Sequence, residues 1–169
     1  MVEVSLLARR RIEAAFAKGV FEEMAREFGE DAARRILARA VTAMARAAAE
    51  SFAQTAPEGA NLAHFRAIQS LWRADDALSI EELPAEAGEF HFNVTKCRYA
   101  EMYRELGLGE LGAILSCQRD AAFCEGYHPA LELERTKTIM QGATHCDFRY
   151  RWEAPATPAP ASRQRPDEI

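Results

Sequence analysis

The chain has 169 residues, of which 49% are hydrophobic and 28% charged, which are ordinary values for one globular domain with its own core. Its net charge of −5 argues against nucleic acid as a partner, because a phosphate-binding face needs concentrated lysine and arginine. No apolar run approaches the roughly 18–20 residues that cross a bilayer, which argues against a membrane-spanning protein.

The N-terminal segment is the reverse of a signal peptide, because it carries Glu3 and its arginines follow its apolar residues. We therefore expect a cytoplasmic protein without a membrane partner. In that compartment the four cysteines are expected to be thiols rather than two disulfides.

Apolar residues recur every three or four positions in the first half of the chain and predict three helices, over 4–28, over 31–55 and from Asn61 onward. Gly29 ends the first helix, and Asp31 and Asn61 cap the next two. We expect the apolar stripes to pack into the core, with a homo-oligomer through these N-terminal helices as the alternative. The stripes are Leu7, Ile12, Phe16, Val20 and Met24; Leu37, Val41, Met44, Ala48 and Phe52; and Leu62, Phe65, Ile68 and Trp72.

The period changes to two after the third helix. Alternating residues predict strands over 78–82, 89–96, 130–139 and 144–152, the last two as an antiparallel hairpin, and helices over 97–107 and 109–126. We therefore predict an α+β fold, with an N-terminal layer of about three helices packed with a small, largely antiparallel sheet and two further helices.

The predicted domain covers residues 1–153, with a helical part at 1–75 and a cysteine-containing part at 76–153. Residues 154–169 contain four prolines and no apolar periodicity, which predicts a disordered tail.

Cys97 stands where a predicted strand gives way to a helix, with Thr95 as the expected cap. The free N–H groups of a helix start and its dipole stabilise a thiolate, and Lys96 and Arg98 add positive charge. The pattern therefore predicts a lowered thiol pKa and a nucleophile at Cys97. The alternative is a small buried residue at a tight junction.

Cys117, Asp120 and Cys124 share one face of a predicted helix, at i, i+3 and i+7. A thiol beside a carboxylate suits a nucleophile with a general acid–base, or two ligands of a zinc-type metal. We expect no metal or other cofactor, because neither the CxxC of a zinc ribbon nor an HxxxH is present. Cys124, beside Phe123, is predicted to be a core residue.

Arg135 lies where the alternating strand face changes from leucine to cations. Its planar guanidinium suits bidentate capture of a substrate carboxylate, and the alternative is an ion pair with Asp120 or Glu101. Thr138, on the other face of that strand, is a further substrate-binding candidate.

Cys146 shares a strand face with aromatic residues, which is typical of a core position, and whether it also lines a substrate pocket stays open. His91 and Asn93 supply, with Cys97, the ingredients of a Cys–His–Asn site. His91 is therefore also a substrate-binding candidate.

Three segments, FNVTKCRYAEMYRELG, ELGAILSCQRDAAFCEGYHPALELERTKTIMQG and CDFRYR, resemble the L-2-amino-thiazoline-4-carboxylic acid hydrolase family. The resemblance implies hydrolytic opening of a small cyclic amidine or thioimidate acid, towards a carbamoyl-cysteine in the case of the thiazoline. The positions that it marks are Cys97, Cys117, Asp120, Arg135, Cys146 and Asp147.

The resulting hypothesis is a hydrolase of a small-molecule carboxylate, in which Cys97, or second Cys117, attacks the C=N carbon. Asp120 would move protons, and Arg135 would anchor the carboxylate.

A glycine followed closely by Cys-Asp-Phe also resembles the end of vinyl-reductase-type (V4R) domains. That resemblance implies, as the alternative, a non-catalytic domain that senses a small molecule or a metal. A third hypothesis is hydrolysis at a metal held by the pattern cysteines and Asp120.

Overall fold

Two long helices open the computed structural model, which describes residues 4–153; the predicted tail at 154–169 lies outside them. They are α1 (Leu6–Phe28) and α2 (Glu30–Ala53), joined at Gly29, whose φ of 81° favours glycine. Gly29 ends the first helix as predicted, but it also caps the second. The prediction of Asp31 as that cap is wrong, because Asp31 lies inside the first turn of α2, where its charge suits the helix dipole.

The remaining elements confirm the predicted α+β fold class. In chain order they are α3 (Leu62–Ile68), α4 (Ser70–Arg73), a short 3₁₀ turn (Ala74–Asp76), β1 (Leu78–Leu83), β2 (Glu89–Cys97), α5 (Arg98–Glu105), α6 (Gly109–Gly112), the π-helical turn η2 (Ala113–Cys117), α7 (Gln118–Tyr127), β3 (Leu131–Glu134), η3 (Ile139–Gln141) and β4 (Cys146–Trp152).

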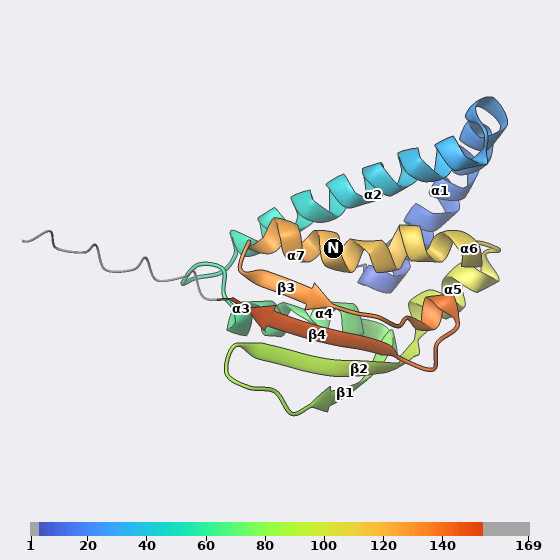
Figure 1. Cartoon of the computed structure of the whole chain (residues 1–169). Helices are drawn as coiled ribbons and strands as arrows, with labels where there is room; N and C mark the ends of the chain where they lie inside the picture. The colour runs from blue at the N-terminus through green and yellow to red at the C-terminus, as the bar shows by residue number, and fades with distance from the viewer. Residues whose placement is uncertain (1–3, 154–169) are drawn as a thin grey trace, which may run out of the picture.

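In the described part of the chain the strands form one antiparallel sheet in the order β1-β2-β4-β3. The predicted hairpin of the last two strands is present, although β3 ends at Glu134 and the chain then leaves the sheet. Figure 1 shows α2 and α7 running together above the sheet, with the β3 edge nearest to α7. The inner sheet face and these helices enclose the aromatic part of the core.

A register shift between β1 and β2 decides which way Cys97 faces. Ser79 pairs with Lys96 and the next residue, Ile80, pairs with Val94, so Thr95 is an extra residue in β2. A bulge of this kind interrupts the alternation of the strand. Cys97 therefore faces the core together with Val94, rather than lying on the opposite face.

Close contact between α2 and α7 depends on small residues. Ala45 and Ala49 of α2 are buried, and a Cβ built on Gly126 of α7 would lie 2.5 Å from the carbonyl oxygen of Arg46. The two helices therefore approach backbone to backbone, which places the side chains of α7 over the sheet.

Only part of the predicted α1 stripe packs against the core, through Leu7. Ala14 and Phe21 of α1 contact the core, whereas Ile12 and Phe16 are 68% and 76% exposed. The predicted core packing is therefore wrong for Ile12 and Phe16, and also for Val20 of α1 and Met44 of α2, which are 38% and 54% exposed. The face of α1 that includes Ala14 meets the core, and in α2 the buried residues are Ala33, Leu37, Val41, Ala45 and Ala49. The homo-oligomer stays a prediction.

Over residues 4–153 we find no helix with the length and apolar character that a membrane crossing requires.

Candidate functional site

A cavity of about 310 Å³ lies between the helices and the inner face of the sheet. Its wall draws on segments from α1 through to β4, so both ends of the described chain meet there. The contributing segments are α1, α2, the α3–α4 segment, β1, β2, α5, η2, α7, the segment after β3 and β4. Another hollow, of about 380 Å³, lies between α3, α4 and β1, and no residue that the sequence predicted for the site lines it.

Five of the predicted site residues line the 310 Å³ cavity. They are Cys97 at the end of β2, Cys117 and Asp120 around the start of α7, Arg135 after β3, and Cys146 at the start of β4. The fold therefore brings together five of the six residues that the family resemblance marks, all except Asp147, although these five span 50 positions from Cys97 to Cys146. Cys124 is buried and does not line the cavity, in agreement with its predicted core role.

The local geometry around Cys117 comes from a change of helix type. The π-helical turn η2 ends at Cys117, and α7 begins at the next residue. A π-helical turn widens the helix and re-aims the side chains that follow it, and such turns are frequent at functional sites. The cavity face of this helix consists of Ser116, Cys117, Arg119, Asp120 and Phe123.

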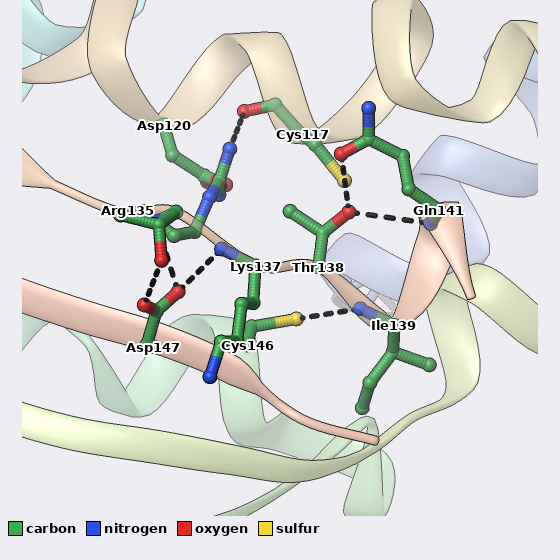
Figure 2. Close-up of polar contacts among 10 residues, drawn as sticks. Cys117, Asp120, Arg135, Lys137, Thr138, Ile139, Gln141, Cys146 and Asp147 are labelled. Atoms are coloured by element: carbon green, nitrogen blue, oxygen red, sulfur yellow. Dashed lines mark hydrogen bonds and ion pairs between the residues drawn. The ribbon is translucent and has the colours of Figure 1, made fainter. Parts of the chain in front are cut away.

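Arg135 is held by three partners at the cavity wall, and Figure 2 shows the two polar ones, Asp120 and Cys117. Its guanidinium makes an ion pair with Asp120, donates to the carbonyl oxygen of Cys117 at 2.9 Å, and lies 5.0 Å from the ring centre of Phe148. The sequence left two roles open for Arg135, capture of a substrate carboxylate or an ion pair with Asp120 or Glu101. The ion pair with Asp120 is present. Burial raises the pKa of Asp120, and the positive charge of Arg135 opposes that rise.

The thiols at the cavity have raised pKa values. Burial raises the pKa of Cys97 to about 11 and that of Cys117 to about 12, and nearby Asp120 adds to the second rise. Cys97 is itself the N-cap of α5, and its Sγ accepts from the N–H of Ala100 at 3.4 Å. That bond lowers the thiol pKa, but burial outweighs it. The predictions of Thr95 as the cap and of a lowered pKa at Cys97 are therefore wrong.

Cys146 is also buried, and its Sγ accepts from the N–H of Ile139 at 3.2 Å. The next residue, Asp147, points away from the sulfur and accepts three bonds from Thr136 and Lys137, at 2.6–3.0 Å (Figure 2). Because Thr136 directly follows Arg135, Asp147 positions the segment that carries the guanidinium.

His91 and Thr138 lie outside the cavity wall. His91 is on the outer face of the sheet, where its Nε2 lies 3.6 Å from Oε2 of Glu89. The bulge at Thr95 separates His91 from Cys97, so the predicted Cys–His–Asn arrangement is not formed. Thr138 caps η3, accepting from the N–H of Gln141 and donating to its side-chain oxygen. Neither position supports the predicted contact with substrate.

Sequence reasoning missed the polar residues at another part of the cavity wall, Arg10 and Glu13 of α1 and Arg119 of α7. A signal for Arg119 exists, because Ser116, Arg119 and Phe123 stand at i, i+3 and i+7 on one helix face. Arg10 carries no comparable signal, since α1 reaches the cavity only through tertiary packing.

Within residues 4–153 no three His, Cys, Asp or Glu side chains are arranged to hold a metal ion. The zinc hypothesis, which requires the pattern cysteines to act together with Asp120, therefore has no ligand set in this part of the chain.

Among solved structures, the chain is similar to the phenol-responsive sensory domain of the transcription activator PoxR, crystallised with phenol. The two share 15% sequence identity with a TM-score of 0.51, over 82% of this chain and 73% of that chain. This likeness shows a shared fold.

No curated protein gives a significant match. The profile of the family described as L-2-amino-thiazoline-4-carboxylic acid hydrolase matches residues 9–150, which include most of α1 and every cavity cysteine. The chain therefore belongs to the L-2-amino-thiazoline-4-carboxylic acid hydrolase family.

Proposed function

We propose that the chain hydrolyses a small cyclic amidine- or thiazoline-type carboxylic acid in the 310 Å³ cavity. One observation carries the proposal: Cys97, Cys117 and the Asp120–Arg135 pair line the same cavity. The family assignment supports hydrolysis of this substrate class. The three groups supply a nucleophile and a proton carrier within one wall.

Cys97 is the proposed nucleophile, and Cys117 is the second choice. The pKa of Cys97, about 11, is below the value of about 12 at Cys117, and the N–H of Ala100 stabilises negative charge on its sulfur. As the Sγ–carbon bond forms, the electron pair of the C=N bond moves to the ring nitrogen, which takes the thiol proton. Attack therefore needs no thiolate in the free protein.

Asp120 is the proposed proton carrier. It is the carboxylate that pairs with Arg135, and because burial raises its pKa it is a stronger base than an exposed carboxylate. It takes a proton from the water that attacks the adduct and gives it to the nitrogen or sulfur that left the carbon as the ring opened. The Cys97–carbon bond breaks, the thiol is restored, and one water has been added to the substrate.

The apolar wall of the cavity suits a flat ring. Phe52, Trp72 and Phe123 line it and contact one another, with ring centres 5.3–5.9 Å apart. Aromatic faces pack against planar groups with little loss of side-chain entropy. The proposed place of the substrate ring is against this wall, in the cavity that the sulfur of Cys97 also lines.

The test is ring opening of L-2-amino-thiazoline-4-carboxylate, followed by mass spectrometry of the carbamoyl product. Cys97→Ser is expected to abolish turnover while the circular dichroism spectrum is unchanged. Cys124→Ser, a buried cysteine outside the cavity, is the matched control and is expected to stay active. Full activity in both Cys97→Ser and Cys117→Ser would sink the thiol mechanism, and an inactive wild type would sink the substrate assignment.

A sensory role is the second candidate, favoured by the fold likeness to a phenol-responsive domain and by the aromatic wall. It predicts that phenol raises the melting temperature of the wild type and of Cys97→Ser equally. It also predicts that no ring-opened product forms. Turnover that depends on Cys97 would exclude this candidate in favour of the hydrolase.

A further inference from the structure

Arg10 and Arg119 meet at the cavity wall around a single carboxylate. Nη1 of Arg10 lies 2.5 Å from Oε2 of Glu13, and Nη2 of Arg119 lies 3.3 Å from the same oxygen. Arg119 also donates from Nε to the carbonyl oxygen of Leu115 at 2.7 Å, which fixes the plane of its guanidinium. Two cations thus share one anionic oxygen, although they come from helices at opposite ends of the described chain.

The lining of the cavity is more positive than its own acids can balance. Four arginines and two carboxylates line it, so two positive charges are in excess; they are Arg9, Arg10, Arg119 and Arg135 against Glu13 and Asp120. The side chains of Arg10 and Arg119 are only 18% and 13% exposed, so water screens them weakly. Burial and the positive charge of Arg10 both lower the pKa of Arg119, which marks the repulsion between the two cations.

Arg135 is already committed to other partners. It neutralises Asp120, donates to the Cys117 carbonyl and stacks against Phe148. Capture of a second carboxylate would pull it from Asp120 and leave that buried acid without its cation. Within the described residues, by contrast, Nη2 of Arg10 and Nη1 of Arg119 donate to no protein group, and both arginines face the cavity.

We propose that Arg10 and Arg119 form the carboxylate-binding subsite of the cavity, with Glu13 as the group that holds both guanidinium planes in place. The inference rests on the proposed function, since the ligand is the carboxylate of the acid that is hydrolysed. Arg119 precedes Asp120 directly on α7, so a carboxylate held there keeps the rest of the ligand beside the proton carrier. The subsite thereby selects acids over neutral amidines.

The test compares binding of acids with binding of their uncharged primary carboxamides by titration calorimetry. The probes are L-2-amino-thiazoline-4-carboxylate and phenylacetate, each with its carboxamide. We expect wild type to bind each acid about tenfold or more tightly than its carboxamide, the ratio that loss of a charge-assisted pair produces. Arg10→Gln and Arg119→Gln are expected to lose this preference, and Arg119→Lys to keep part of it.

Arg11→Gln is the matched control, because Arg11 lies on the same helix but pairs with Glu105 and does not line the cavity. It is expected to keep the full preference. If Arg119→Gln fails to fold, Arg10→Gln still decides the question, because Arg10 pairs with Glu13 of its own helix and its loss breaks no side-chain pair between helices of the described chain. An unchanged ratio in Arg10→Gln, or no acid preference in wild type, overturns the subsite. Acid preference that follows the prediction without any turnover would overturn the hydrolase proposal instead.

Discussion

Arg135 ion-pairs with Asp120 across the gap between the segment after β3 and helix α7, and the same guanidinium donates to the carbonyl oxygen of Cys117. One side chain thus ties together the carboxylate and the backbone of the helix that carries a cavity thiol. The pair is partly buried, with 13% of the Arg135 side chain and 26% of the Asp120 side chain exposed. It therefore bears on both stability and chemistry.

Replacing Arg135 by methionine is expected to reduce the free energy of unfolding by about 3 kcal/mol, because it leaves a buried carboxylate without its cation. Urea unfolding measures the loss. The control is Arg46→Met, which breaks the exposed pair with Glu125 and is expected to cost under about 1 kcal/mol. Equal losses in the two variants would show that the Arg135–Asp120 pair is no more than a surface ion pair.

Alkylation of Cys97 by iodoacetamide is expected to rise about tenfold per pH unit from pH 7 to 10. The sign follows from the raised pKa: burial moves the Cys97 pKa above its ordinary 9.0 to about 11, so the thiolate becomes more abundant only as the pH approaches that value. Mass spectrometry of peptides from the native protein measures each cysteine separately. A rate that is already constant near pH 7 would contradict the raised pKa.

Gly126→Ala is expected to destabilise the fold by about 1–3 kcal/mol, because its Cβ would lie within 3.0 Å of three backbone atoms of Arg46. Thermal unfolding measures the change. Gly19→Ala is the matched control in α1, where nothing lies within 4 Å of the added methyl group. That substitution is expected to stabilise by about 0.5–1 kcal/mol, since alanine is the better helix former. Stabilisation by both would mean that α2 and α7 can separate at no cost.

Phe16→Ser is expected to weaken self-association of the chain, if the exposed stripe of α1 is the predicted homo-oligomer contact. The reason is that Phe16, 76% exposed, offers the largest apolar area of that stripe to a partner. Size-exclusion chromatography with light scattering gives the mass at each concentration. Glu22→Ser, on another face of α1, serves as the control and is expected to leave the mass unchanged. A wild type that is monomeric at every concentration would contradict the prediction.

The spacing of apolar residues along the sequence was enough to predict most of the helices and strands. The three-to-four-residue spacing predicted α1 and α2, and alternation of Phe90, Phe92 and Val94 predicted β2 with its buried face. Asn61 caps α3 as predicted, its side chain accepting from the N–H of His64 at 2.9 Å. These features depend on residues within one or two turns of each other, which is why a single sequence reveals them.

Features that depend on neighbours far along the chain could not be predicted in this way. The bulge at Thr95 is visible only in the pairing of β1 with β2, and it reverses the side of the sheet on which Cys97 lies relative to His91. Two apolar faces on α1 compete in the sequence, and only packing against α2 and α5 shows which one is buried.

By itself, the sequence determined the fold class, the helix and strand spans to within a few residues except at the end of β3, which stops five residues before the predicted end, and five residues that line the cavity. The tertiary structure decided the pKa values and the charge partners of these residues. Enclosure raises the thiol pKa values that a helix start alone would lower, and folding gives Arg135 a carboxylate partner of its own. It also carries Arg10 to Arg119, more than a hundred residues away in the chain. Burial and long-range charge are properties of the assembled fold, because they depend on which distant segments exclude water from one another.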